Sequence, residues 1–76
     1  MIGETETVVL KHDIERYDLK QGDVGAVVHV YSDGDALEVE FVTAEGTTVA
    51  LLTLTESDIR PMGDKEILHV REFARA

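Results

Sequence analysis

The chain has 76 residues and carries 16 acidic against 7 basic side chains, a formal net charge of −9 with neutral histidines. A chain of this length buries only about 60% of its unfolded-state surface, so we expect one small domain with little core to spare. The absence of cysteine excludes disulfides, thiolate zinc sites and thiol nucleophiles within these residues.

The acidic balance bears on the kind of partner. Nucleic-acid binders draw much of their affinity from Lys and Arg that displace condensed counterions, and this chain has no surplus of them. An acidic domain is better suited to a basic protein surface, toward which it is also steered electrostatically. The start "MIGETETVV" has no basic leader and no window approaches a membrane span, so we expect a soluble, cytoplasmic protein without membrane contact.

Five short β-strands are predicted in chain order. β-Branched and apolar runs separated by turn residues indicate strands at residues 6–11, 24–31, 36–43, 47–54 and 59–61. A polar connection, residues 12–23, follows the first strand, and Ile14 and Leu19 are the expected anchors to the core. "TESD" at residues 55–58 resembles one turn of 3₁₀ helix, and Pro61 places the last strand at an edge.

Two turns predict how the middle strands pair. Asp33-Gly34 fits a two-residue hairpin loop in which both residues have positive φ, and residues 44–46 fit a three-residue loop with Gly46 left-handed. The first loop pairs residues whose numbers sum to 67, and the second pairs residues whose numbers sum to 90. The expected inner-face pairs are Val30–Leu37, Val28–Val39, Ala26–Phe41, Phe41–Val49, Val39–Leu51 and Leu37–Thr53.

This order of elements is typical of a small SH3-like five-stranded barrel, in which closure hides the sheet edges. The alternative is an open twisted sheet that dimerises. We expect the all-β barrel over residues 1–61 and a C-terminal extension over residues 62–76 whose structure the pattern leaves undecided. In the extension, Ile67, Val70 and Ala74 share a helical face, whereas Leu68 and Val70 would share a strand face.

The predicted outer face of the sheet is the candidate binding site. The same register places Val27, Val42, Ala50, Leu52 and Leu54 there, around Glu38, Glu40 and His29. A solvated face normally alternates to polar residues, and an apolar surface with acidic neighbours is typical of a contact site. The simpler interpretation is that the segment from Ile67 to Phe73, or a second copy of the chain, covers this face.

Other polar and aromatic groups fit either a functional or an ordinary structural role. His29 opposite Glu38 could be an acid/base or pH-sensitive pair, but such a pair is more often structural. Tyr17 and Tyr31 could flank a groove together with Asp33, as in SH3-like barrels, or pack in loops. No metal site is expected, because His12-Asp13 and Asp33 with Asp35 supply too few ligands.

Neither a catalytic group nor a cofactor site is predicted. Ser32 and Ser57 have no spaced His and Asp for a nucleophile triad. The residues we expect to contact a partner are Val27, His29, Tyr31, Glu38, Glu40, Leu52 and Tyr17.

The sequence resembles two known families. "LKQGDVGAVVHVY" resembles the glycine-containing motif of the ribosomal and transcription-factor KOW barrels, although acids replace most of the expected basic residues. Residues 7–61, with "TVVL", "LKxGDxGxVVHVY", "EVEFV" and "TLxxxxIRP", are similar throughout to domain-of-unknown-function family 4926, small proteins of bacteria. The second resemblance implies an SH3-like fold and supplies no catalytic residue. It also implies a gene beside that of another small protein, hence a toxin–antitoxin-like pair.

The preferred hypothesis is therefore a noncatalytic protein-binding module, the antitoxin-like or stabilising member of a two-gene pair. Its partner would be a protein, such as a neighbouring-gene product, or a second copy of the chain. One alternative is an RNA- or ribosome-associated barrel that uses Lys11, Arg16 and Lys20, although the net charge disfavours nucleic acid. Another is an accessory subunit of an enzyme, which rests on analogy of fold.

Overall fold

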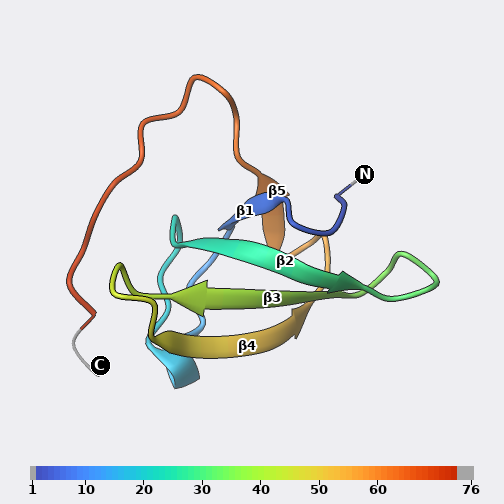
Figure 1. The fold of residues 1–76 in the computed structure, drawn as a ribbon, viewed down its shortest axis with the longest axis horizontal. Coiled ribbons are helices and arrows are strands. Elements are labelled where there is room, and N and C mark those ends of the chain that lie inside the picture. Colours follow the sequence, from blue (N-terminus) through green and yellow to red (C-terminus); the bar gives the residue numbers. More distant parts are fainter. Residues whose placement is uncertain (1, 74–76) are drawn as a thin grey trace.

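The computed structural model describes residues 2–73 and consists of one five-stranded antiparallel sheet (Figure 1). The strands are β1 (Thr7–Leu10), β2 (Val24–Val30), β3 (Leu37–Val42), β4 (Thr48–Leu54) and β5 (Ile59–Pro61). They lie in the order β4-β3-β2-β1-β5. A single 3₁₀ turn, η1 (Glu15–Tyr17), interrupts the connection from β1 to β2, and the described residues contain no α-helix. The predicted all-β class and the five strands are confirmed.

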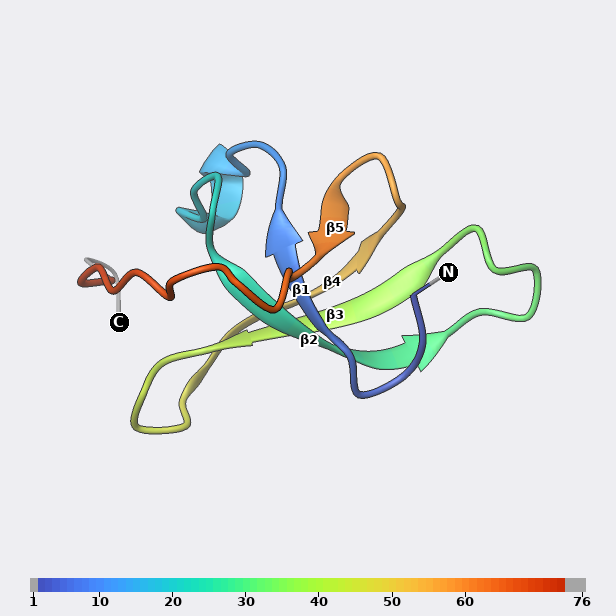
Figure 2. The same cartoon turned by 90° about the horizontal axis from the view of Figure 1, so that it is seen from above.

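The sheet is open, and the expected closure into a barrel was wrong. β5 pairs with β1, whereas β4 has β3 as its only strand partner in the described chain. β5 has three residues, and its last, Pro61, has no amide hydrogen to donate, so β5 offers little backbone for a second partner. Figure 2 shows β1 and β5 on one side of the curved ribbon formed by β2, β3 and β4. The open sheet matches the alternative architecture, and dimerisation stays a prediction.

The core lies between the concave side of β2–β4 and the strands β1 and β5. Its members are apolar and come from every strand, from the segment before β1 and from the first connection. They are Ile2, Val8, Leu10, Leu19, Val27, Leu37, Val39, Phe41, Ala50, Leu54 and Ile59. Leu19 is buried and Ile14 packs against the cluster, so both predicted anchors of residues 12–23 are confirmed.

The first hairpin contains a β-bulge that the turn did not predict. Val30 pairs with Leu37 and His29 with Glu38 as expected, but Val27 then takes the place opposite Val39. Val28 is therefore the extra residue, and every side chain toward the start of β2 changes face. Val27 is 1% exposed and Val28 46% exposed, the reverse of the prediction.

The loop of this hairpin also differs from the expected two-residue turn. Within residues 32–35 only Gly34 has a positive φ, at 76°. The type I′ turn, which needs positive φ at both central residues, therefore does not form. The Tyr31 amide donates to the Ala36 carbonyl at 3.0 Å, which leaves residues 32–35 as a four-residue loop. The Asp35 amide donates to the Asp33 side chain at 3.0 Å, so this aspartate is a turn former.

The second hairpin confirms its turn and adds a second bulge. Gly46 has a φ of 93°, and the Thr43 amide donates to the Thr47 carbonyl, as a three-residue loop requires. Val42 pairs with Thr48 as predicted, but Phe41 pairs with Ala50, which makes Val49 the extra residue. Beyond it the face of β4 is inverted. Ala50 and Leu54 are buried and Leu52 is half-buried, while Leu51 and Thr53, predicted inside, are exposed.

Gly25 allows side chains of β3 to pack directly against the backbone of β2. A Cβ at this position would lie 2.8 Å from both Phe41 Cε1 and Val39 Cγ1, which is closer than carbon atoms pack. The ring of Phe41 therefore occupies the space that a side chain at position 25 would need. This close approach explains the glycine inside β2.

The C-terminal extension forms neither a helix nor a strand over residues 62–73. Figure 1 shows it leaving β5 as a wide loop and returning toward the turn between β3 and β4. Ile67 is 94% and Val70 88% exposed, so this stretch does not cover the sheet as the simpler interpretation had it. Ala74, part of the expected helical face, lies outside the described residues.

Candidate binding surface

The inverted registers change which predicted contact residues can reach a partner. Val27 lies in the core and the half-buried Leu52 packs against it, so the prediction that these two lie on the outer face was wrong. His29, Tyr31 and Tyr17 are exposed. β3 contains no extra residue, and its glutamates Glu38 and Glu40 point outward and are half-buried by their neighbours.

A polar cluster on the outer side joins β2, β3 and β4. The Tyr31 hydroxyl donates to Glu38 Oε1 at 2.8 Å, and the Thr53 hydroxyl donates to the same oxygen at 2.9 Å. The rings of His29 and Tyr31 meet edge to face with centroids 4.8 Å apart. The hydrogen bond to the Glu38 carboxylate raises the pKa of Tyr31 above its usual value. This cluster holds Tyr31 in place at the surface.

His29 and Glu38 are neighbours across the strands but not an ion pair. Their Cα atoms are partners in the ladder, whereas His29 Nδ1 lies 3.5 Å from Glu4 Oε2. Glu38 is occupied by Tyr31 and Thr53. The predicted position of His29 opposite Glu38 is confirmed. The acid/base pair considered as the functional alternative does not form, because Tyr31 and Thr53 donate to the Glu38 carboxylate.

Exposed aliphatic side chains adjoin this cluster. Leu51, opposite Glu40 in the ladder, is 53% exposed, and the bulged Val28 is exposed on β2. Glu40 accepts a 2.7 Å hydrogen bond from the Thr48 hydroxyl, which holds its carboxylate on the surface. We call the set of these residues the acidic–apolar face. Its members are Val28, His29, Tyr31, Glu38, Glu40 and Leu51.

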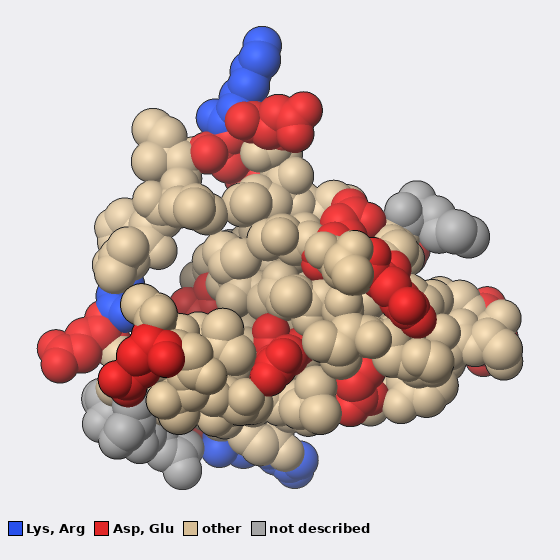
Figure 3. Space-filling view, in the orientation of Figure 1, with Lys and Arg blue, Asp and Glu red and all other residues tan. Residues whose placement is uncertain are grey.

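The charge around this face has one predominant sign. Figure 3 shows acidic side chains spread over the molecule in the orientation of Figure 1, with Lys and Arg at the margins. The sequence prediction had the acidic members of the face right but most of its apolar members wrong. Of the five predicted there, Val42 is exposed, Leu52 is half-buried, and the other three, Val27, Ala50 and Leu54, are buried. Val28 and Leu51 were missed because they were assigned to the core, and only the position of the bulges could have placed them outside.

Tyr17 lines a second surface, which shares Leu51 with the acidic–apolar face. A groove between η1 and β4 is lined by Ile14, Arg16, Tyr17 and residues 51–54. The guanidinium of Arg16 lies 5.8 Å from the centroid of the Tyr17 ring. Among the described residues that line this groove, neither Tyr31 nor Asp33 occurs, so the two tyrosines do not flank a common groove.

The remaining polar candidates have structural roles. His12 Nε2 lies 2.8 Å from Asp58 Oδ1, and its Nδ1 lies 2.9 Å from the Asp13 carbonyl oxygen. The hydrogen bond to that carbonyl, followed by the one to Asp58, raises the pKa of His12. Ser57 lies in the predicted turn, which closes with the Asp58 amide donating to the Thr55 carbonyl at 2.9 Å. Residues 2–73 contain no group of three or more His, Asp or Glu arranged to hold a metal ion.

Together, the fold and this surface define a small all-β domain with an open sheet and an acidic outer face. In the described part of the chain, no helix has the length and apolarity to cross a membrane. The domain of unknown function DUF4926 matches residues 4–61, and the chain belongs to this family. Comparisons with curated proteins and with solved structures returned no match.

Proposed function

We propose that this protein is a noncatalytic binding module whose acidic–apolar face docks on a basic surface of a partner protein. The observation that carries the proposal is the pair Glu38 and Glu40 held between exposed apolar side chains on one face of the sheet. Apolar area supplies affinity when it leaves water, and the carboxylates select a cationic partner and speed association. The net charge of −9 acts in the same direction over longer range.

The rigid geometry of the face supports this role. Glu38 and Glu40 are each fixed by hydroxyl donors from β4, and Tyr31 is fixed on Glu38. Side chains that are already ordered lose less conformational entropy on binding. Leu51 stands on an edge strand that contains no charged residue, so a partner can approach it from the side.

The partner we would test first is the product of a neighbouring gene, which this protein would neutralise or stabilise. This step rests on the resemblance to a family whose members are encoded beside another small protein. Binding would be measured with purified proteins at two ionic strengths. We expect the association rate to fall as salt rises, because exposed charges are screened within about 10 Å at 0.1 M salt.

Two matched substitutions test the face itself. Leu51→Glu should weaken binding at least about tenfold, since it places a charge in the apolar part of the contact. Leu68→Glu makes the same change at an exposed leucine of the extension and should leave affinity unchanged. Likewise, Glu40→Lys should weaken binding, whereas Glu45→Lys in the β3–β4 turn should have little effect. Equal affinities for all four variants would refute the proposal.

Two other occupants of this face give different outcomes. A dimer of the chain would appear as doubled mass in sedimentation and would be lost in Leu51→Glu. An RNA partner would bind in a salt-sensitive manner that depends on Lys11, Arg16 and Lys20 and not on Leu51. Either result would replace the proposal by that alternative.

A further inference from the structure

A cavity of about 320 Å³ lies at one end of the sheet, where the C-terminal extension returns to the body. Body residues from the first connection, β3 and β4 form one wall, among them Leu19, Phe41 and Val49. Arg71 and Phe73 of the extension form the other. The acidic–apolar face contributes no residue to it.

Arg71 is held by a charged and geometrically specific contact. Its Nε donates to Asp23 Oδ1 at 2.9 Å and its Nη2 to Asp23 Oδ2 at 2.6 Å, and Nη2 also reaches the Asp18 carbonyl oxygen at 2.9 Å. Such a two-point contact with a carboxylate suits arginine and not lysine. Partial burial by itself raises the pKa of Asp23, but the bond from Arg71 and that from the Lys20 amide outweigh it and hold this pKa below its usual value.

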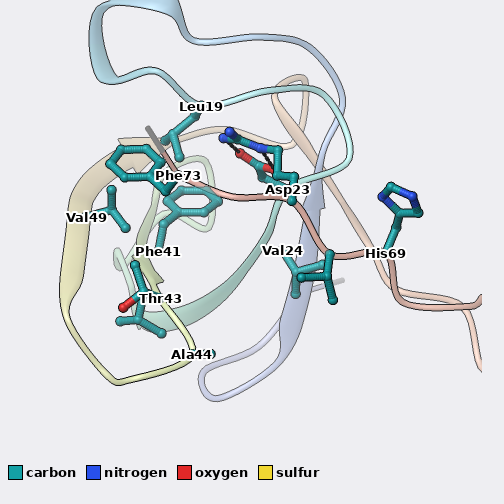
Figure 4. Close-up of a pocket in the computed structure, with 12 residues that line it drawn as sticks. Leu19, Asp23, Val24, Phe41, Thr43, Ala44, Val49, His69 and Phe73 are labelled. Atoms are coloured by element: carbon teal, nitrogen blue, oxygen red, sulfur yellow. Dashed lines mark hydrogen bonds and ion pairs between the residues drawn. The ribbon is translucent and has the colours of Figure 1, made fainter. Parts of the chain in front are cut away.

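Phe73 supplies the apolar part of the contact. In Figure 4, Leu19, Phe41 and Val49 lie around the Phe73 ring, and all four line the same cavity. The guanidinium of Arg71 lies 5.8 Å from the centroid of the Phe73 ring, so the two side chains also contact each other. His69 also lines the cavity, and its ring lies apart from that of Phe73 in Figure 4.

The residues between Glu66 and Arg71 are all exposed. Glu66 is tied to Arg60 near β5, and then Ile67, Leu68 and Val70 are all exposed before Arg71. The extension is therefore held at two points with an exposed span between them. Its end contacts the body through one arginine and one aromatic ring, with a single residue between the two.

We propose that this cavity is a binding site for an extended peptide of a partner protein that carries arginine two residues before an aromatic residue. Arg71 and Phe73 form one side of the cavity and hold Asp23 and the apolar wall, the contacts that the peptide would make, so they compete with that peptide. A partner segment is favoured over a second copy because a cationic peptide complements the net charge of −9, whereas two copies repel each other. The site does not depend on the acidic–apolar face, so either proposal can fail without the other.

The experiment uses the full chain and two labelled peptides, measured by fluorescence anisotropy. One peptide has the sequence of residues 67–73. The other is a polyalanine peptide of the same length in which Arg-Ala-Phe supplies the only side chains larger than methyl. The double variant Arg71→Ala with Phe73→Ala frees the cavity, and it should bind both peptides at least about tenfold more tightly than the unmodified chain. A tethered competitor acts at a millimolar effective concentration, which weakens a peptide of about 0.1 mM affinity by roughly this factor.

Further variants assign the binding to Asp23. Adding Asp23→Lys to the double variant should abolish binding, whereas adding Asp64→Lys, an exposed aspartate of the extension, should not. A peptide with glutamate in place of arginine should not bind. Thermal unfolding of each variant checks that the body remains folded.

Three results would overturn the proposal. The first is no binding by the double variant, and the second is binding that survives Asp23→Lys. The third is binding of the 67–73 sequence but not of Arg-Ala-Phe, together with a doubled mass of the unmodified chain in sedimentation that Asp23→Lys removes. This last outcome would make the occupant the extension of a second copy.

Discussion

The body of the protein, residues 2–61, and its extension, residues 62–73, are held by different kinds of contact. The body packs apolar side chains from all five strands, and none of its described polar or charged side chains is buried. The extension is attached by two arginine–carboxylate pairs, Arg60–Glu66 and Arg71–Asp23, and by the ring of Phe73.

This difference means that the contacts that stabilise the body are not the contacts that hold the extension in place. Apolar burial depends little on salt or pH, whereas ion pairs at a surface are screened by salt and lost when the carboxylate is protonated. The body should therefore unfold as a unit, while the extension can leave its site without unfolding the sheet. A segment attached in this way is suited to exchange with a competing ligand.

The largest expected difference in stability comes from truncating a leucine to alanine in each of the two regions. Leu10, in β1, is 1% exposed, and Leu10→Ala should lower the free energy of unfolding by about 2–5 kcal/mol. Leu68→Ala removes the same atoms from an exposed position and should change it by less than about 0.5 kcal/mol. Urea denaturation measures both. Similar losses would mean that the extension is part of the cooperative core.

A smaller loss of stability is expected at Gly25, where the packed body leaves no space for a side chain. Gly25→Ala places a methyl group 2.8 Å from Phe41 and Val39, so we expect a loss of about 1–3 kcal/mol. Gly3→Ala is the control, because its Cβ would meet no atom within 4 Å. A neutral Gly25→Ala in the same denaturation experiment would show that the Phe41 ring can move aside.

The strands, the turn at Gly46 and the anchors Ile14 and Leu19 were predictable because each depends on local sequence. At Gly34 the place of the turn was predictable, but its four-residue form was not. Pairing next to each turn was predictable as well. The two bulges were not, because apolar residues occupy consecutive positions in both strands. Val27 and Val28 in β2, like residues 49–52 in β4, fit either face, so alternation cannot choose between registers.

The residues of the candidate sites also divide into those that local sequence predicts and those that it does not. Glu38 and Glu40 were assigned correctly to the outer face because β3 alternates strictly and holds no extra residue. The exposed Leu51 was missed because its face depends on the bulge at Val49. The contact between Arg71 and Asp23 joins residues 48 positions apart, and no local pattern marks it. The alternation of residues predicts which side chains are buried only where a strand has no bulge. An ion pair between residues far apart in the sequence can be found only once the fold is known.

The attachment of the extension should depend on pH. The folded-state pKa of Asp23 is lowered, so its pair with Arg71 contributes fully above the unfolded value of about 3.9 and is lost as pH falls through the folded value. Asp23→Asn should release Phe73 at neutral pH and cost at most about 1 kcal/mol of stability.

Asp64→Asn, at an exposed position of the extension, is the control for that change. The ring signals of Phe73 in NMR spectra report the release, and added salt should promote it in the unmodified chain. Ring signals unchanged by Asp23→Asn would show that Phe73 alone holds the extension.

The smallest effect concerns the attachment near β5, where no loss of global stability is expected. The two hydrogen bonds from Arg60, followed by that from the Gly63 amide, lower the pKa of Glu66 to about 2. Arg60→Ala should raise this pKa only part of the way toward its usual value of about 4.3, because the amide donor remains. Lys65→Ala should leave it unchanged. NMR titration of the Glu66 carboxyl measures both, and an unchanged pKa in Arg60→Ala would assign the shift to the amide and leave the extension with one ion-pair anchor, at Asp23.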